Sequence, residues 1–242
     1  MIPDFIDRLE NRTMFAAGPV VTSSLFVGDQ NGITALVVGF DRALDPASAQ
    51  KVDNYRLVGN RNGGRAQTLP FAAATYDPAT FAVTLTRSDL FSFRFFKRLR
   101  FAIAGEQAGN VSDPSGALVD GDRDGVAGGK SVATFKVHRG RGFGFRDLDG
   151  DRVKLKARGA EGRRPLYCLS VKKRAVHQVW LDGFNNTLTG TVKPTRSSDG
   201  LVSIGRVVLV HPSNINALSS SFVVGQTVAD GQAPIDPQIR TF

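Results

Sequence analysis

The sequence contains one cysteine, Cys168, so it has no intrachain disulfide and no cysteine-based zinc site. Its three histidines, His138, His177 and His211, lack the spacing of paired metal ligands. No apolar run approaches the roughly 20 residues that a membrane-spanning helix needs. Glycine-x-serine-x-glycine, Walker, Rossmann and zincin motifs do not occur. These absences disfavour the common hydrolase, nucleotide-binding and zinc chemistries, and we expect a protein that is not an enzyme.

What the chain does contain is enough apolar residues for a core and many turn residues. It has 242 residues, 41% of them hydrophobic, with 26 glycines and 17 phenylalanines. Short apolar runs alternate with turn signals such as Asp45-Pro46 and Asp77-Pro78, a pattern typical of sandwiches. We therefore expect an all-β fold, with one helical turn at Ala47–Lys51. The predicted strands are Ile33–Phe40, Asp53–Val58, Phe81–Thr86, Leu99–Ala104, Ser131–Val137, Asp151–Ala157, Tyr167–Val171, Ala175–Leu181, Thr187–Val192 and Leu201–Val210.

Composition divides the chain into five segments. Apolar residues in the first segment have the spacing of one face of a short helix. Glycines between residues 139 and 144 lower the cost of bending and supply no core, which favours a linker. The predicted segments are an N-terminal segment at 1–18, an Ig-like β-sandwich at 19–138, the Gly/Arg linker at 139–144, a smaller antiparallel β module at 145–211 and an irregular tail at 212–242.

An aspartate-rich stretch, Val119–Gly129, is the most specific motif. Asp120, Asp122 and Asp124 alternate along a glycine-rich turn, so three carboxylates can converge on one point. Ca²⁺ prefers six to eight oxygen ligands from carboxylates, carbonyls and water. The sequence therefore predicts a Ca²⁺ site here. A looser version, formed by Asp147, Asp149 and Asp151, predicts a second site.

Neither stretch is an EF-hand. An EF-hand loop requires a bidentate glutamate at position twelve. That position is Ser131 when counted from Asp120, and Arg158 when counted from Asp147. The missing ligands would come from other loops, and Asp113 and Asp41 are the candidates. The alternative is that these aspartates are turn residues that bind nothing, because Asp favours turns for backbone reasons alone.

The charge balance suggests a second class of function. The net charge is +9, from 31 basic and 22 acidic residues. A basic face attracts polyanions through a salt-dependent term that is independent of sequence. No nucleic-acid motif accompanies the charge, which favours polysaccharide over nucleic acid as a partner. The residues of this alternative polyanion site are Arg163, Arg164, Lys172, Lys173 and Arg174.

Two residues with reactive side chains have ordinary structural explanations. Cys168 lies in the apolar run Leu166–Val171, which predicts a buried, inert thiol. His177 would share a strand face with Ala175 and Val179, which predicts a packed strand residue. Neither indicates catalysis.

The first half resembles a known family. Its Gly39-Phe-Asp-Arg-Ala-Leu-Asp-Pro-Ala47 corner, followed by Asp53-Asn-Tyr-Arg-Leu-Val58, looks like bacterial Ig-like domains of the S-layer-associated type. Tyr76-Asp-Pro-Ala-Thr80, Val83-Thr-Leu-Thr86 and the stretch from Asp113 to Phe135 resemble the later half of the same domain.

The second half and the N-terminal segment are similar to parts of planctomycete surface proteins. The similarity lies in Asp147-Leu-Asp-Gly-Asp-Arg-Val153, Leu188-Thr-Gly-Thr-Val192 and the leader-like Arg8–Ala17, in which Met14 and Phe15 replace the usual leucines. These resemblances imply a secreted or cell-surface protein. Its role would be structural or adhesive, and its partners would be cell-envelope components, polysaccharide included, or other surface-protein domains.

Overall fold

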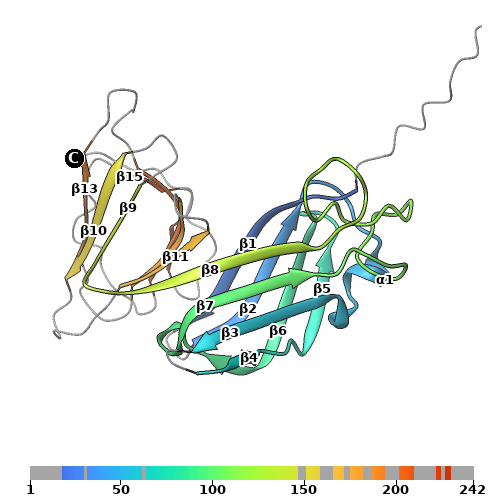
Figure 1. Ribbon diagram of the computed structural model, residues 1–242, viewed down its shortest axis with the longest axis horizontal. Coiled ribbons are helices and arrows are strands. Elements are labelled where there is room, and N and C mark those ends of the chain that lie inside the picture. Colours follow the sequence, from blue (N-terminus) through green and yellow to red (C-terminus); the bar gives the residue numbers. More distant parts are fainter. Residues whose placement is uncertain are drawn as a thin grey trace, which may run out of the picture.

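A computed structural model of the chain has two β units that lie side by side and are joined by one long strand, β8 (Figure 1). It describes residues 18–29, 32–61, 64–146, 151–158, 166–171, 175–181, 187–193, 202–209, 222–224 and 227–229. The predicted helical face and leader-like motif at the N-terminus lie outside these residues. The described residues contain no helix of the length and apolarity needed to cross a membrane.

The first unit is a sandwich of two sheets. One has the strand order β1-β2-β6-β5, and the other begins with the order β4-β3-β7-β8. These orders correspond to the A-B-E-D and C′-C-F-G sheets of an immunoglobulin-type fold. The prediction of an all-β, Ig-like fold is therefore confirmed. The strands are β1 (Val21–Asp29), β2 (Gly32–Phe40), β3 (Tyr55–Arg61), β4 (Ala66–Thr68), β5 (Ala73–Asp77), β6 (Ala82–Phe91), β7 (Phe96–Ile103) and β8 (Ser131–Gly140).

Three short helical segments connect these strands. Asp45 caps the N-terminus of helix α1 (Pro46–Ala49), because its side chain accepts a hydrogen bond from the Ser48 N–H. The 3-10 helix η1 (Val52–Asn54) precedes β3, and η2 (Phe93–Phe95) precedes β7. The predicted helical turn at Ala47–Lys51 corresponds to α1, which begins one residue earlier.

Alternation along the strands builds the core of the sandwich. In β3 and in the first half of β6, the buried residues stand at every second position, as a pleated strand with one buried face requires. Phe26 on β1 contacts Phe135 on β8 across the sandwich, with ring centroids 5.1 Å apart. Each fully buried apolar side chain of this size contributes about 1.5–3 kcal/mol.

The second unit packs a small sheet against a continuation of the large one. Strands β11, β12, β14, β15 and β16 extend the sheet beyond β8, so the sheet has nine strands. The separate three-stranded sheet has the order β13-β10-β9. Strand β14 pairs in parallel with β12, β15 and β16, so antiparallel pairing does not extend to every strand of this unit. The strands are β9 (Gly142–Arg146), β10 (Arg152–Arg158), β11 (Leu166–Val171), β12 (Ala175–Leu181), β13 (Thr187–Lys193), β14 (Val202–Leu209), β15 (Phe222–Val224) and β16 (Thr227–Ala229).

The structure differs from the sequence prediction in two segments. Residues 139–144, predicted as a linker, belong to β8 and β9 except for Arg141. Phe143 and Phe145 are half-buried against the second core, whereas Gly142 and Gly144 are exposed, so this segment alternates as a strand does. The tail predicted to be irregular contains the short strands β15 and β16.

The core of the sandwich extends into the second unit, which also has a core cluster of its own. Tyr167, Leu169, Trp180 and Val208, all beyond β8, belong to the core cluster of the sandwich. The Trp180 ring meets the Phe93 ring edge-on, with centroids 5.3 Å apart. The second unit is therefore held by side-chain packing as well as by the continuous sheet.

A buried glutamine of the second unit is hydrogen-bonded to β1, in the other sheet of the sandwich. Strand β1 is an edge strand, so the N–H and C=O groups of alternate residues point away from its neighbour β2. Gln178 on β12 is fully buried, and its amide pairs with both backbone groups of Phe26. Its Oε1 accepts from the Phe26 N–H at 3.0 Å, and its Nε2 donates to the Phe26 C=O at 3.0 Å. The side-chain amide thus takes the place of a neighbouring strand at this point of the edge.

Candidate metal centre

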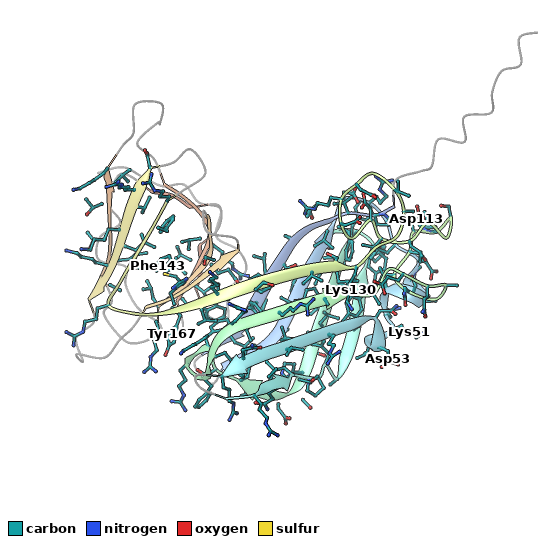
Figure 2. All side chains as sticks on the ribbon, viewed as in Figure 1. Lys51, Asp53, Asp113, Lys130, Phe143 and Tyr167 are labelled. Carbon is teal, nitrogen blue, oxygen red and sulfur yellow. The ribbon has the colours of Figure 1, made fainter. Side chains whose placement is uncertain are left out.

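The aspartate-rich motif lies in the loop between β7 and β8, which runs from residue 104 to residue 130. The second unit joins at the other end of β8, so the loop lies at the far end of the sandwich. Lys130, at the end of this loop, and Asp113, within it, lie far from Phe143 of the second unit (Figure 2). Any ligand bound here acts on the end of the sandwich and not on the junction between the units.

Asp120 organises the turn of this loop. It is 3% exposed, and its two carboxylate oxygens accept hydrogen bonds from the N–H groups of Arg123 at 2.7 Å and Gly125 at 3.0 Å. Its own N–H donates to the Pro19 carbonyl at 3.0 Å, which ties the loop to the start of the sandwich. Arg123 and Gly125 both have positive φ, 63° and 89°, a conformation that glycine adopts freely and arginine does not.

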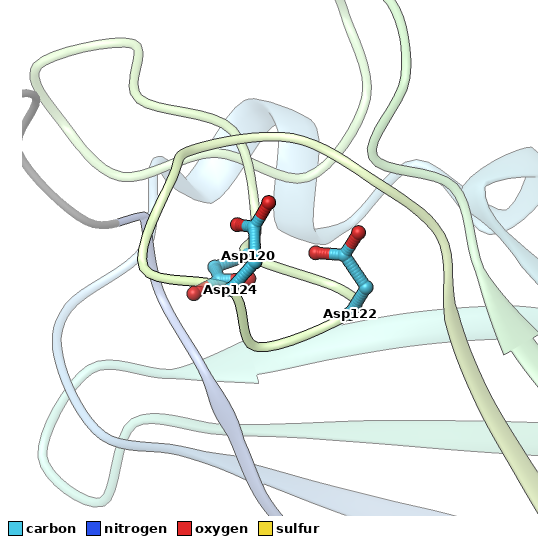
Figure 3. Close-up of side chains that lie close together, drawn as sticks. All are labelled: Asp120, Asp122 and Asp124. Atoms are coloured by element: carbon cyan, nitrogen blue, oxygen red, sulfur yellow. The ribbon is translucent and has the colours of Figure 1, made fainter.

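The three aspartates converge as the sequence predicts. Asp120, Asp122 and Asp124 each offer a carboxylate oxygen, and these oxygens lie within 4.8 Å of one another. The carboxylate of Asp122 points toward the other two (Figure 3). Two oxygens bound to one Ca²⁺ at about 2.3–2.6 Å can be at most roughly 5 Å apart, so the group has the size that Ca²⁺ requires. An acidic cluster that could hold a metal ion is therefore present.

Hydrogen bonds within the loop explain two of the three positions without an ion. Asp120 holds the turn, and Asp124 Oδ1 accepts from the Val126 N–H at 2.8 Å. Asp122 is exposed and makes no hydrogen bond with any residue that the structure describes. Asp122 is therefore the residue whose substitution distinguishes metal binding from turn formation.

The two aspartates expected to complete the site, Asp41 and Asp113, have hydrogen-bond partners outside it. Asp41 accepts from the Val20 N–H at 2.7 Å and pairs with Arg42 at 3.0 Å. Asp113 accepts from the Ser115 N–H, the Ser115 hydroxyl and the Ala117 N–H. Among the described residues, neither joins the cluster of three. The remaining ligands would be backbone carbonyls and water.

Because of these hydrogen bonds, the stability of the folded protein depends on pH. Burial opposes ionisation of Asp113 and Asp41, but the hydrogen bonds and Arg42 outweigh it and hold the pKa of each below its ordinary 3.8. Their stabilisation is therefore present above pH 3.8 and is lost as the pH falls through the folded-state pKa values.

At pH values below 3.8 we expect the melting temperature of the wild type to decrease, and to decrease less steeply in Asp113→Asn and Asp41→Asn. Melting curves between pH 5 and 2 measure this, with exposed Glu106→Gln as the control; superimposable acid profiles for all four proteins would contradict the prediction.

Of the residues of the other two predicted sites, the structure describes only Asp151. Asp147 and Asp149 lie outside the described residues, so the second Ca²⁺ site stays a prediction; Asp151 is fully buried directly before β10. The five residues of the alternative polyanion site, at positions 163, 164 and 172–174, also lie outside the described residues.

Cys168 is fully buried in the core of the second unit. Burial raises the pKa of its thiol, so the reactive thiolate is disfavoured. This is the inert thiol that the apolar run predicts.

Comparison with known proteins gives distant structural similarity only. No family model and no curated protein matches the chain. Solved structures of the surface layer protein SbsC match: its domains 1–6 (13% identity, TM-score 0.32) and rSbsC(31-844) (13%, 0.33), each over 65% of this chain. The N-terminal part of bacterial SbsC matches over 64% (12%, 0.27). The chain covers 24% of each of the first two structures and 40% of the third.

Proposed function

We propose that the chain is a non-catalytic structural module of the cell surface or extracellular space, a spacer or adhesion element. One observation carries the structural role, the junction between the units. A sheet that continues from β8 into β11 and β12 resists bending, because rotation would break a ladder of hydrogen bonds. The buried Gln178–Phe26 pair adds a second attachment on the opposite sheet. Two separate attachments suit a spacer that keeps its partners at a fixed distance.

In this proposal the sandwich at 19–138 and the β module at 145–211 remain two structural units that act as one body. The sequence motifs shared with bacterial Ig-like surface domains support export, and cell-envelope components or neighbouring surface-protein domains are the proposed partners. Protease treatment of intact cells tests the location. We expect externally added protease to remove the protein from intact cells; full protection until the cells are lysed would contradict it.

Calcium is the proposed cofactor, bound by Asp120, Asp122 and Asp124. Three carboxylates within 4.8 Å repel one another, and a divalent ion turns this repulsion into attraction. Ca²⁺ suits an irregular loop better than Mg²⁺, which demands octahedral geometry. The ion would fix the loop that ties Pro19, at the start of the sandwich, to the start of β8.

Thermal unfolding with Ca²⁺ and with chelator tests the calcium site. A ligand that binds only the folded state at about 100 times its Kd adds roughly 2.7 kcal/mol to the free energy of unfolding. We expect Ca²⁺ to raise the melting temperature of the wild type, Mg²⁺ to raise it less, and Asp122→Ala to remove the response while keeping the stability of the chelated wild type.

Asp120→Ala is the matched comparison. This substitution leaves the N–H groups of Arg123 and Gly125 without their acceptor, so it should destabilise the protein even in chelator, by about 1–3 kcal/mol. If chelation leaves the melting temperature of the wild type unchanged, the three aspartates only form a turn and the calcium proposal is wrong.

A further inference from the structure

The outward face of the sandwich sheet β3-β7-β8 carries four exposed cations, Arg56, Arg98, Arg100 and Lys136. Each stands next to a buried residue on its strand, so all four side chains point away from the sandwich core. These strands lie in front of β1, β2 and β6 in Figure 1, so this face is turned toward the reader. We call these four residues the cationic face.

The strand register places the four cations close together. Arg98 lies directly opposite Lys136 on one side and opposite Asn60 on the other. Arg100, two residues along, lies opposite Thr134 and Val58. Directly opposite Cβ atoms in an antiparallel pair are about 4.5–5.5 Å apart, at which distance like charges destabilise the sheet.

The strands that carry this charge contain no acid. None of the described strands of the nine-stranded and three-stranded sheets contains Asp or Glu. The ion pair between Arg42 and Asp41 lies in the loop after β2 and includes none of these four cations. The acids that lie in strands are Asp29, Asp77 and Asp89, all on the opposite sheet. Within the strands of the sandwich, the acids therefore lie on one sheet and the cationic face lies on the other.

The cationic face ends where the second unit begins. Two residues beyond Lys136, His138 stacks on Phe143 with ring centroids 4.1 Å apart, and the three-stranded sheet covers the nine-stranded sheet from there on. The open part of the face is therefore bounded on one side by the second unit.

We propose that the cationic face binds an acidic polysaccharide through its carboxylate or sulfate groups. Closely spaced cations without acidic partners attract a polyanion, and its binding relieves the repulsion between Arg98 and Lys136. The open part of this face, up to Lys136 on β8, holds no aromatic side chain at its outward positions, so the stacking platform that binds single-stranded nucleic acid is missing there. The face is a sheet surface and presents no helix or ribbon that fits a major groove. The binding site is separate from the calcium loop and does not depend on it.

Binding to immobilised polygalacturonate over a range of salt concentrations tests this proposal. The face variant Arg56→Gln/Arg98→Gln/Arg100→Gln/Lys136→Gln is compared with a control variant that neutralises the exposed Lys51, Lys130, Lys154 and Lys156. Both variants lower the net charge from +9 to +5 (9 − 4 = 5), so they differ in whether the charge is removed from the cationic face or from other parts of the surface. We expect the face variant to bind about thirtyfold more weakly than the wild type, because this is the loss that four exposed ion pairs of ordinary strength would give. The control variant should bind less than about threefold more weakly.

Wild-type binding should also weaken steeply with salt, by roughly a hundredfold between about 50 and 200 mM for four ionic contacts of the kind that nucleic acids make. The melting temperature of the face variant should equal or exceed that of the wild type, because a like-charge pair is removed. If the quadruple variant does not fold, Arg98→Gln/Lys136→Gln gives the same comparison with Lys154→Gln/Lys156→Gln as its control. Equal loss in face and control variants, no binding by the wild type, or stronger binding to duplex DNA than to polygalacturonate at equal salt would overturn the proposal.

Discussion

Gln178→Leu is expected to lower the free energy of unfolding by about 2–5 kcal/mol. Leucine keeps the volume of the side chain but leaves the buried N–H and C=O of Phe26 without partners, and each such group costs about 1–3 kcal/mol. Denaturant unfolding measures the loss. Gln67→Leu, at an exposed position of β4, is the control and should change stability by less than about 0.5 kcal/mol.

The same substitution should increase exchange of the Phe26 amide hydrogen with solvent, because that hydrogen is bonded to Gln178 alone. A Gln178→Leu protein with wild-type stability and wild-type exchange at Phe26 would show that the second unit is not attached to the opposite sheet in solution.

Trp180→Ala is expected to cost about 3–5 kcal/mol, the usual loss for a large aromatic side chain in a core. Trp180 is 2% exposed and packs against Phe93 in the core that the units share. We also expect the single unfolding transition to separate into two, since the side chain joins the units. Calorimetry at neutral pH measures both effects.

Trp180→Phe provides the control. It keeps a ring against Phe93 and removes an indole N–H that is buried without a hydrogen-bond partner among the described residues. Its cost should be less than half that of the alanine variant. Equal losses for both variants would mean that packing at this position does not hold the units together.

Local patterns predicted much of the sandwich. The apolar run Ile33–Phe40 corresponds to β2, and the alternation of Phe81–Thr86 and Leu99–Ala104 corresponds to the first half of β6 and the second half of β7. Strand β1 was not predicted, because its Val-Thr-Ser-Ser start mixes polar residues on both faces. Its edge position explains this composition, since Thr22 is exposed and only Ser24 and Phe26 are fully covered.

The junction and the cationic face could not be predicted, because both depend on register between distant strands. Gln178 looks like a solvated strand residue until β12 is known to lie beside the edge of β1, 152 positions away in sequence. Arg98 and Lys136 are ordinary exposed cations until their strands pair in register. The three aspartates were predicted because all three lie within five residues, so no long-range pairing was needed to bring them together.

Unfolding of the wild type followed by two probes tests the account most directly. Trp180 is the only tryptophan and lies at the junction, so its fluorescence reports separation of the units, whereas far-ultraviolet circular dichroism reports all strands. A protein in which the units form one rigid body should give coincident transitions in urea by both probes. A fluorescence transition complete at lower urea, while the strand signal persists, would show that the units separate before they unfold and would contradict the proposed role as a rigid spacer.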